Sequence, residues 1–210
     1  MERITLKSNY LNAETDIGYI RHLYQQIDWS DQLIGVLGAR GTGKTTLLLQ
    51  RMKLNYPADG IALYVSMDDI YFTNHSLIEL AESFRIQGGK ILFIDEVHKY
   101  PTWAREIKNI YDTYRDLKIV FTGSSVIDIY LQEADLSRRA VFYELTGLSF
   151  REYLHFKGIY STDIIGLQEI LHQHPDIALK LSKEFKPIPQ FQAYLDHGYY
   201  PFFKENLNTM

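Results

Sequence analysis

Residues 32–52 read Gln-Leu-Ile-Gly-Val-Leu-Gly-Ala-Arg-Gly-Thr-Gly-Lys-Thr-Thr-Leu-Leu-Leu-Gln-Arg-Met, and this stretch decides the fold. The apolar run over 32–37 stops at Gly38, as a buried parallel strand does before a turn. The apolar positions after Thr45 predict a helix through Met52 that packs its apolar face on a sheet. The sequence therefore predicts a strand, a glycine-rich loop and a helix in direct succession.

The loop from Gly38 to Thr45 fits the pattern G-x-x-x-x-G-K-[ST] in the context that this motif requires. Its glycines let the backbone wrap an anion, so that loop N–H groups and the helix dipole face the phosphates of ATP. Lys44 is expected to reach the β and γ oxygens, and Thr45 to offer a hydroxyl to Mg²⁺. The alternative is a glycine-rich turn without a ligand. The residues predicted to bind the nucleotide are Gly38, Ala39, Arg40, Gly41, Thr42, Gly43, Lys44, Thr45 and Thr46.

Four further runs rich in β-formers predict strands over 61–66, 90–94, 118–122 and 140–144. Helical stretches separate them, and one of these, after Pro101, places apolar residues from Trp103 to Tyr114 at helical spacing. Five strands that alternate with helices predict an α/β fold.

The strand over 90–94 ends in two carboxylates, Asp95 and Glu96, at the edge where an open α/β sheet has its ligand crevice. Asp95 is predicted to bind the magnesium shell. Glu96 is predicted to orient and deprotonate the water that attacks the γ-phosphate. A strand that ends in Asp-Glu is common, and the glycine-rich loop upstream is what favours this interpretation.

The strand over 118–122 is followed by Ser124 and Ser125, whose hydroxyls could contact the γ-phosphate or the attacking water. Serines in this position are also common turn and N-cap residues. His98 follows the carboxylates and could either gate Glu96 or hydrogen-bond within its loop.

Arg138 and Arg139 directly precede the fifth predicted strand. An arginine here could offer its planar fork to a phosphate as a finger, in cis or in trans. Most paired surface arginines are instead solvated or bound to a carboxylate.

The composition sets broader limits. The net charge is -4, the pI is about 6.0, and cysteine is absent. A whole-surface nucleic-acid binder is disfavoured, although a local basic patch leaves nucleic acid open as a partner. The lack of cysteine excludes a disulfide framework and fits the cytoplasm. No signal peptide or membrane-spanning run is expected.

Beyond residue 145 the alternation of strands ends, and Ser149 to Glu152 predicts a capping box that opens a helix through about His155. We expect a core over 1–147 and a helical lid or linker over 148–210. The aromatic density near the end of the chain predicts surface that another segment buries.

Several segments together resemble the prokaryotic AAA+ superfamily ATPases, and most of all the branch whose members often carry a nuclease-fold C-terminal domain. They are Gly-Ala-Arg-Gly-Thr-Gly-Lys-Thr-Thr-Leu-Leu, Ile-Asp-Glu-Val-His, Phe-Thr-Gly-Ser-Ser, Arg-Arg-Ala and Leu-Ser-Phe-Arg-Glu-Tyr-Leu, within residues 30–157.

The resemblance implies a P-loop NTPase three-layer sandwich with a five-stranded parallel sheet of order 5-1-4-3-2. It also implies a sensor at Ser124 or Ser125, a finger at Arg138 or Arg139, and a further C-terminal domain beyond a truncated helical part. This chain has Ser137 where the family usually has glycine before the arginine. The segment 197–201 is similar to a late Gly-Gly-aromatic-Pro signature, with His-Gly in place of Gly-Gly.

The function that we expect is an ATPase module that binds MgATP and drives conformational change in a protein partner or attached domain. Turnover could need a partner or a homo-oligomer. One alternative is a nucleotide-gated switch with little turnover, and another is a P-loop kinase with a small-molecule acceptor. The sequence leaves adenine recognition open: residues 1–31 could wrap the base through Tyr10 or Tyr24, and core packing is the alternative for both tyrosines.

Overall fold

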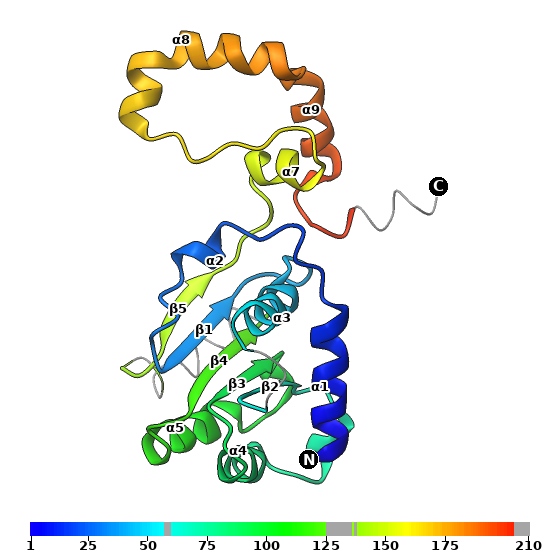
Figure 1. Ribbon diagram of the computed structural model, residues 1–210, viewed down its shortest axis with the longest axis vertical. Coiled ribbons are helices and arrows are strands. Elements are labelled where there is room, and N and C mark those ends of the chain that lie inside the picture. The colour runs from blue at the N-terminus through cyan, green and yellow to red at the C-terminus, as the bar shows by residue number, and fades with distance from the viewer. Residues whose placement is uncertain (57–59, 125–135, 137, 204–210) are drawn as a thin grey trace. The chain divides into compact units, whose positions relative to one another are not determined.

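The computed structural model describes residues 1–56, 60–124, 136 and 138–203 (Figure 1). The chain forms two compact units, Met1–Thr146 and Gly147–Met210. The first unit contains a sheet with flanking helices, and the second is helical. Within the described ranges, no helix is both long enough and apolar enough to span a lipid bilayer.

Five parallel strands build the sheet of the first unit. The order is β2-β3-β4-β1-β5, which is 5-1-4-3-2 from the other edge, so the expected fold class and strand order are confirmed. Each strand starts within one residue of its predicted position. The strands are β1 (Leu33–Leu37), β2 (Ala62–Ser66), β3 (Ile91–Asp95), β4 (Lys118–Gly123) and β5 (Val141–Glu144).

Helices bury both faces of this sheet, because successive strand side chains point to opposite sides. Leu33 belongs to a core that includes residues of α4 and α5, whereas Ile34 belongs to the core around α3. This alternation gives the three layers of the sandwich. The helices are α3 (Lys44–Asn55), α4 (Leu77–Ile86) and α5 (Trp103–Thr113). The short elements are α2 (Leu23–Gln26), η1 (Ile70–Thr73) and η2 (Val97–Lys99).

An N-terminal helix, α1 (Glu2–Glu14), was not anticipated from the sequence. It packs against α3 and the edge strand β2. Its buried residues are Ile4, Ser8 and Asn12, so the buried stripe is mostly polar and lacks an apolar period. The hydroxyl of Ser8 accepts a hydrogen bond of 3.0 Å from the backbone N–H of Tyr64 in β2. The helix thus satisfies a donor that an edge strand otherwise leaves open.

The second unit begins its helical part with the expected capping box. The Ser149 hydroxyl accepts from the Glu152 N–H, the Glu152 carboxylate accepts from the Ser149 N–H, and α7 (Phe150–Phe156) follows. The buried ring of Tyr153 lies 5.5 Å from that of Tyr194 and 5.3 Å from that of Phe203, between centroids. Three further elements are α8 (Leu167–Glu184), α9 (Pro187–Ala193) and a π-helical turn, η3 (Tyr194–Gly198).

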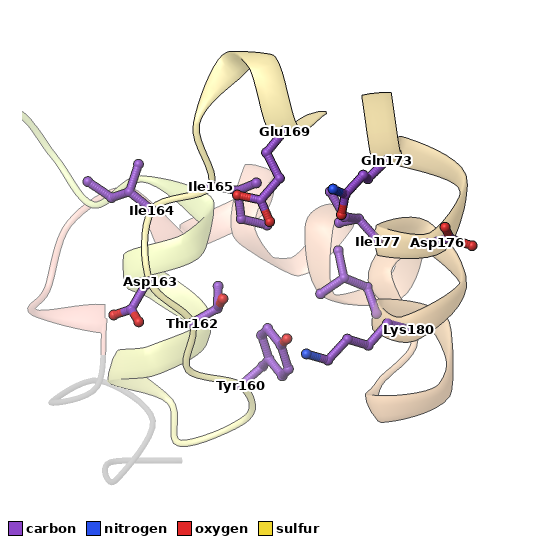
Figure 2. Close-up of a pocket in the computed structure, with 11 residues that line it drawn as sticks. Tyr160, Thr162, Asp163, Ile164, Ile165, Glu169, Gln173, Asp176, Ile177 and Lys180 are labelled. Atoms are coloured by element: carbon purple, nitrogen blue, oxygen red, sulfur yellow. The ribbon is translucent and has the colours of Figure 1, made fainter. Parts of the chain in front are cut away.

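Helix α8 has no buried residue, and a cavity of about 370 Å³ lies between it and residues 160–165 (Figure 2). Glu169 and Gln173 reach toward it from the first half of the helix, while Lys180 reaches toward it from the second half. The lining contains no residue predicted to bind nucleotide. The expected site therefore belongs to the first unit.

Candidate nucleotide site

The predicted phosphate, magnesium and sensor residues come from three neighbouring strands. The glycine-rich loop follows β1, Asp95 ends β3, and Ser124 follows β4, which lies between the other two. The register pairs Leu37 with Gly123 and Ile94 with Phe121. Because all these strands are parallel, their carboxyl ends meet at one edge of the sheet.

The loop backbone adopts conformations that need glycine. Gly38 has φ 153° and Gly43, the N-cap of α3, has φ 96°. A Cβ atom on Gly38 would lie 2.2 Å from the carbonyl oxygen of Leu145. The beginning of the loop is therefore packed directly against the segment that follows β5. Ala39, Arg40, Gly41, Thr45 and Thr46 are exposed, so the loop has a solvent-accessible side.

Lys44 is buried, and its ammonium group lies across the loop. Its Nζ donates to the carbonyl oxygens of Gly38, at 2.8 Å, and Ala39, at 2.9 Å. Burial lowers the pKa of Lys44, and the carboxylates of Glu96 and Asp95 partly oppose that shift. Both carboxylates are thus electrostatically coupled to the cation of the loop.

Asp95 is buried and accepts hydrogen bonds on both carboxylate oxygens. Thr45 donates to Oδ2 at 2.6 Å and Tyr64 donates to the same oxygen at 2.8 Å, while Thr122 donates to Oδ1. Burial raises the pKa of Tyr64, and the charge of Asp95 raises it further, so the phenol stays a donor. Neither Tyr64 nor Thr122 was predicted to orient Asp95, because nothing local in the sequence links them.

Glu96 follows with φ 56°, the one positive value at a non-glycine residue in the described part of the chain. Its backbone N–H donates to the Thr122 hydroxyl at 3.1 Å. Its carboxylate contacts the hydroxyl of Ser124 at 3.0 Å through Oε1 and Nε2 of His98 at 3.2 Å through Oε2. The structure thus brings together Glu96, Ser124 and His98, whereas Ser125 lies outside the described residues.

Arg138 and Arg139 are not brought to the loop. They precede β5, whose first residue, Val141, is opposite Ile34 near the start of β1. The loop follows the other end of β1, roughly 13 Å away at the usual rise per strand residue. Arg139 binds Asp112 of α5, with Nε to Oδ1 and Nη2 to Oδ2 both at 2.9 Å. This pair lowers the pKa of Asp112.

The two tyrosines considered for adenine lie on α1 and α2. Tyr10 is 65% exposed on α1. The Tyr24 hydroxyl donates to Asn55 at the C-terminal end of α3, the end remote from the loop. Tyr24 also packs its ring against Trp29. These contacts support the packing interpretation for Tyr24.

This chain is similar to known proteins in sequence and in fold. A family model described as an AAA domain matches residues 30–154. Among solved structures, C. elegans PCH-2 is 14% identical, with 80% of this chain and 49% of that chain covered and a TM-score of 0.43. AMPPCP-bound DnaA from Aquifex aeolicus is 16% identical, with 75% and 58% covered and a TM-score of 0.41. This chain therefore spans about half the length of these two proteins. No match was found among curated proteins. With more than half of its residues matched by the family model, the chain belongs to the AAA domain family.

Proposed function

We propose that this chain binds MgATP through Gly38–Thr46 and hydrolyses it with Glu96 as the base. The observation that carries the proposal is the 2.6 Å hydrogen bond between Thr45 Oγ1 and Asp95 Oδ2. A hydroxyl at the start of the loop helix and a carboxylate at the end of β3 are the two groups that share a magnesium ion in P-loop ATPases. Here they already lie in contact, with Glu96 next in the chain.

The donor set fits magnesium. Mg²⁺ prefers oxygen ligands and is usually bound by one or two protein groups together with phosphate and water. Thr45 and Asp95 supply such oxygens, and the hydrogen bonds from Tyr64 and Thr122 orient the carboxylate. When bound, the ion would neutralise charge on the phosphate oxygens.

The loop supplies the remaining positive field for the phosphates. The exposed side of the loop and the N-terminus of α3 offer backbone donors and a dipole for the phosphates. The Lys44 ammonium lies at the loop carbonyls, and a phosphate would give this buried cation an anionic partner. Glu96 would accept the proton of the attacking water, and Ser124 would orient that water or the γ-phosphate.

Arg138 is the better candidate for an arginine finger, and it would act in trans. It is exposed and forms no side-chain hydrogen bond or ion pair with another described residue, whereas Arg139 is held by Asp112. Both arginines lie at the end of the sheet where β1 and β5 begin, and the loop lies at the opposite end. A contact between either arginine and the phosphates therefore needs a second subunit. This favours a homo-oligomer.

The output that we propose is conformational work on a protein partner or attached domain, with residues 1–147 as ATPase core and 148–210 as lid or linker. We also propose that the chain belongs to the branch with a C-terminal nuclease-fold domain and that the protein is located in the cytoplasm. A switch with little turnover is the second candidate, because both oxygens of Glu96 are engaged. The kinase alternative lacks an arginine-rich lid, since Arg151 is the only arginine in residues 147–210.

The test is phosphate release from ATP with magnesium, by wild type and Glu96→Gln, together with nucleotide affinity for both. We expect the wild type to turn over and the variant to bind equally well without releasing phosphate. Asp31→Asn serves as a control because it removes a partly exposed carboxylate before β1, away from the loop. Binding without release by both proteins would favour the switch, and no binding by either would refute the site.

A further inference from the structure

Arg21 is a buried cation that joins the glycine-rich loop to the end of the first unit. Its side chain reaches two backbone carbonyls: Nη1 donates to Thr42 at 2.7 Å and Nη2 donates to Thr146 at 2.9 Å. The residue is 7% exposed. Charge-assisted hydrogen bonds in a buried setting are stronger than neutral ones, so this bridge holds the two segments firmly.

The segment that carries Arg21 is itself fixed to the loop helix. Nε2 of Gln50 in α3 donates to the carbonyls of Asp16 and Tyr19, both at 2.8 Å. Gln50 is buried as well. Arg21 therefore starts from a backbone anchored to the same helix whose first turn contains Lys44 and Thr45.

The contact with Thr42 acts on the peptide group that precedes Gly43. In a trans peptide the C=O and the N–H point in opposite directions, so the N–H of Gly43 points away from Arg21. A guanidinium on the carbonyl polarises the amide and strengthens its N–H as a donor. In this motif the loop N–H groups are the ones that face the phosphates.

The contact with Thr146 lies where the chain leaves the first unit. Leu145 donates its N–H to Leu37 at 2.7 Å, and its carbonyl is the group that excludes a side chain at Gly38. Thr146 is the last residue of the first unit. The loop, the end of β5 and Arg21 thus form one hydrogen-bonded assembly.

We propose that Arg21 is a positioning residue for phosphate binding, which holds the Thr42–Gly43 peptide from outside the loop and ties it to Thr146. The inference rests on the proposed function, since it concerns the same phosphate site. Arg21 would not touch the nucleotide. Loss of Arg21 should lower the affinity for phosphates and leave the contribution of Glu96 to the rate of hydrolysis unchanged.

The experiment measures affinities for pyrophosphate, ADP and adenosine by competition with a fluorescent ATP analogue, in wild type, Arg21→Met and Arg21→Lys. We expect Arg21→Met to lower the affinity for pyrophosphate and ADP by about tenfold and the affinity for adenosine by less than about twofold. Arg21→Lys keeps the charge but cannot span both carbonyls, so it should recover part of the loss. In turnover, KM should rise while kcat changes little, because Glu96 and Asp95 are untouched.

Lys53→Met is the matched control. Its Nζ also donates to two carbonyls of the N-terminal part, Ala13 at 2.7 Å and Thr15 at 2.8 Å, but from the last turn of α3. It should leave pyrophosphate affinity unchanged. If Arg21→Met does not fold, Arg21→Lys carries the test.

Two results would overturn the proposal. One is an equal loss of affinity for all three ligands, which a purely structural role produces, and the other is wild-type affinity for pyrophosphate in both Arg21 variants. If the wild type binds neither pyrophosphate nor ATP, the proposed function fails instead, so the two failures are distinguishable.

Discussion

Nε2 of His98 lies 3.2 Å from Oε2 of Glu96, and Nδ1 of the same ring accepts from the Ser124 N–H at 3.3 Å. A ring that accepts through Nδ1 is neutral and carries its proton on Nε2, so it donates to Glu96. Ser124 donates to the other carboxylate oxygen. The proposed base is thus held in one orientation by two side chains.

Substitution of His98 by alanine should increase the rate of ATP hydrolysis. The variant frees Oε2 of Glu96, so that the carboxylate can turn toward water without the free-energy cost of breaking the hydrogen bond to His98. A net hydrogen-bond contribution of about 0.5–1.5 kcal/mol corresponds to an increase in kcat of roughly two- to tenfold, with KM unchanged. The measurement is steady-state phosphate release over a range of ATP concentrations. The control is His75→Ala, whose exposed ring stacks on Tyr71. A fall in kcat would show instead that His98 supports the productive orientation.

Tyr64→Phe should raise the magnesium concentration needed for half-maximal activity. The variant removes the 2.8 Å hydrogen bond to Asp95 Oδ2 and leaves Thr45 as the remaining described donor to that oxygen. Loss of an orienting partner of a metal ligand typically costs 10- to 100-fold in metal affinity, and we expect about tenfold. Titration of ATPase activity with MgCl₂ tests this. Tyr111→Phe is the control, and an equal shift in both variants would remove the role assigned to Tyr64.

Asp69→Asn should lower stability at neutral pH but not in acid. Asp69 accepts from Lys7 of α1 at 2.5 Å and from the Tyr71 N–H at 3.0 Å, and these bonds lower its pKa. Because the folded pKa is depressed, the contribution is present above the unfolded pKa and is lost as pH falls through the folded one.

Since Lys7 is half exposed, we expect a difference of about 0.5–1 kcal/mol at pH 7, measured by urea unfolding, which is lost as the pH falls through the lowered pKa of Asp69. Asp68→Asn is the neighbouring control. A difference that persists in acid would mean that packing or the helix cap, and not the ionised carboxylate, is responsible.

The sheet was predictable because β1, β2, β3 and β4 are short, nearly continuous apolar runs, as strands buried on both faces are, whereas β5 is partly exposed. Helix α1 was not, because its buried stripe of Ile4, Ser8 and Asn12 has a polar majority and its role is to pack along an edge strand. Periodicity detects apolar stripes and misses helices whose buried groups serve as hydrogen-bond partners.

Part of the site was likewise predictable and part was not. Gly38 to Thr45 form one continuous segment and Asp95-Glu96 form another, so local sequence patterns predict both, although their roles remain predictions. Tyr64 reaches Asp95 from 31 residues away and Arg21 reaches Thr42 from 21 residues away. Those contacts depend on strand order and on the path of the N-terminal segment, which no local pattern contains.

Arg138→Ala should lower kcat without changing stability, whereas Arg139→Ala should lower stability. Arg138 is exposed, while Arg139 forms a two-point contact with Asp112 of α5. A surface ion pair of this kind contributes about 0.5–1 kcal/mol to the stability of the fold. A finger contributes about a thousandfold or more to turnover in related chemistry, so a loss of about a thousandfold in kcat is expected for Arg138→Ala.

A mixing experiment tests whether Arg138 is a finger in trans. Arg138→Ala has an intact loop but no finger, and Lys44→Ala has a finger but an impaired loop, so each alone should be nearly inactive. If Arg138 serves a neighbouring subunit, mixed assemblies contain sites with an intact loop and a complete finger, and phosphate release should return to a sizeable fraction of wild type. Because the strand register puts Arg138 at the far edge of its own sheet, a mixture that stays inactive while the subunits associate would show that this arginine is no finger at all.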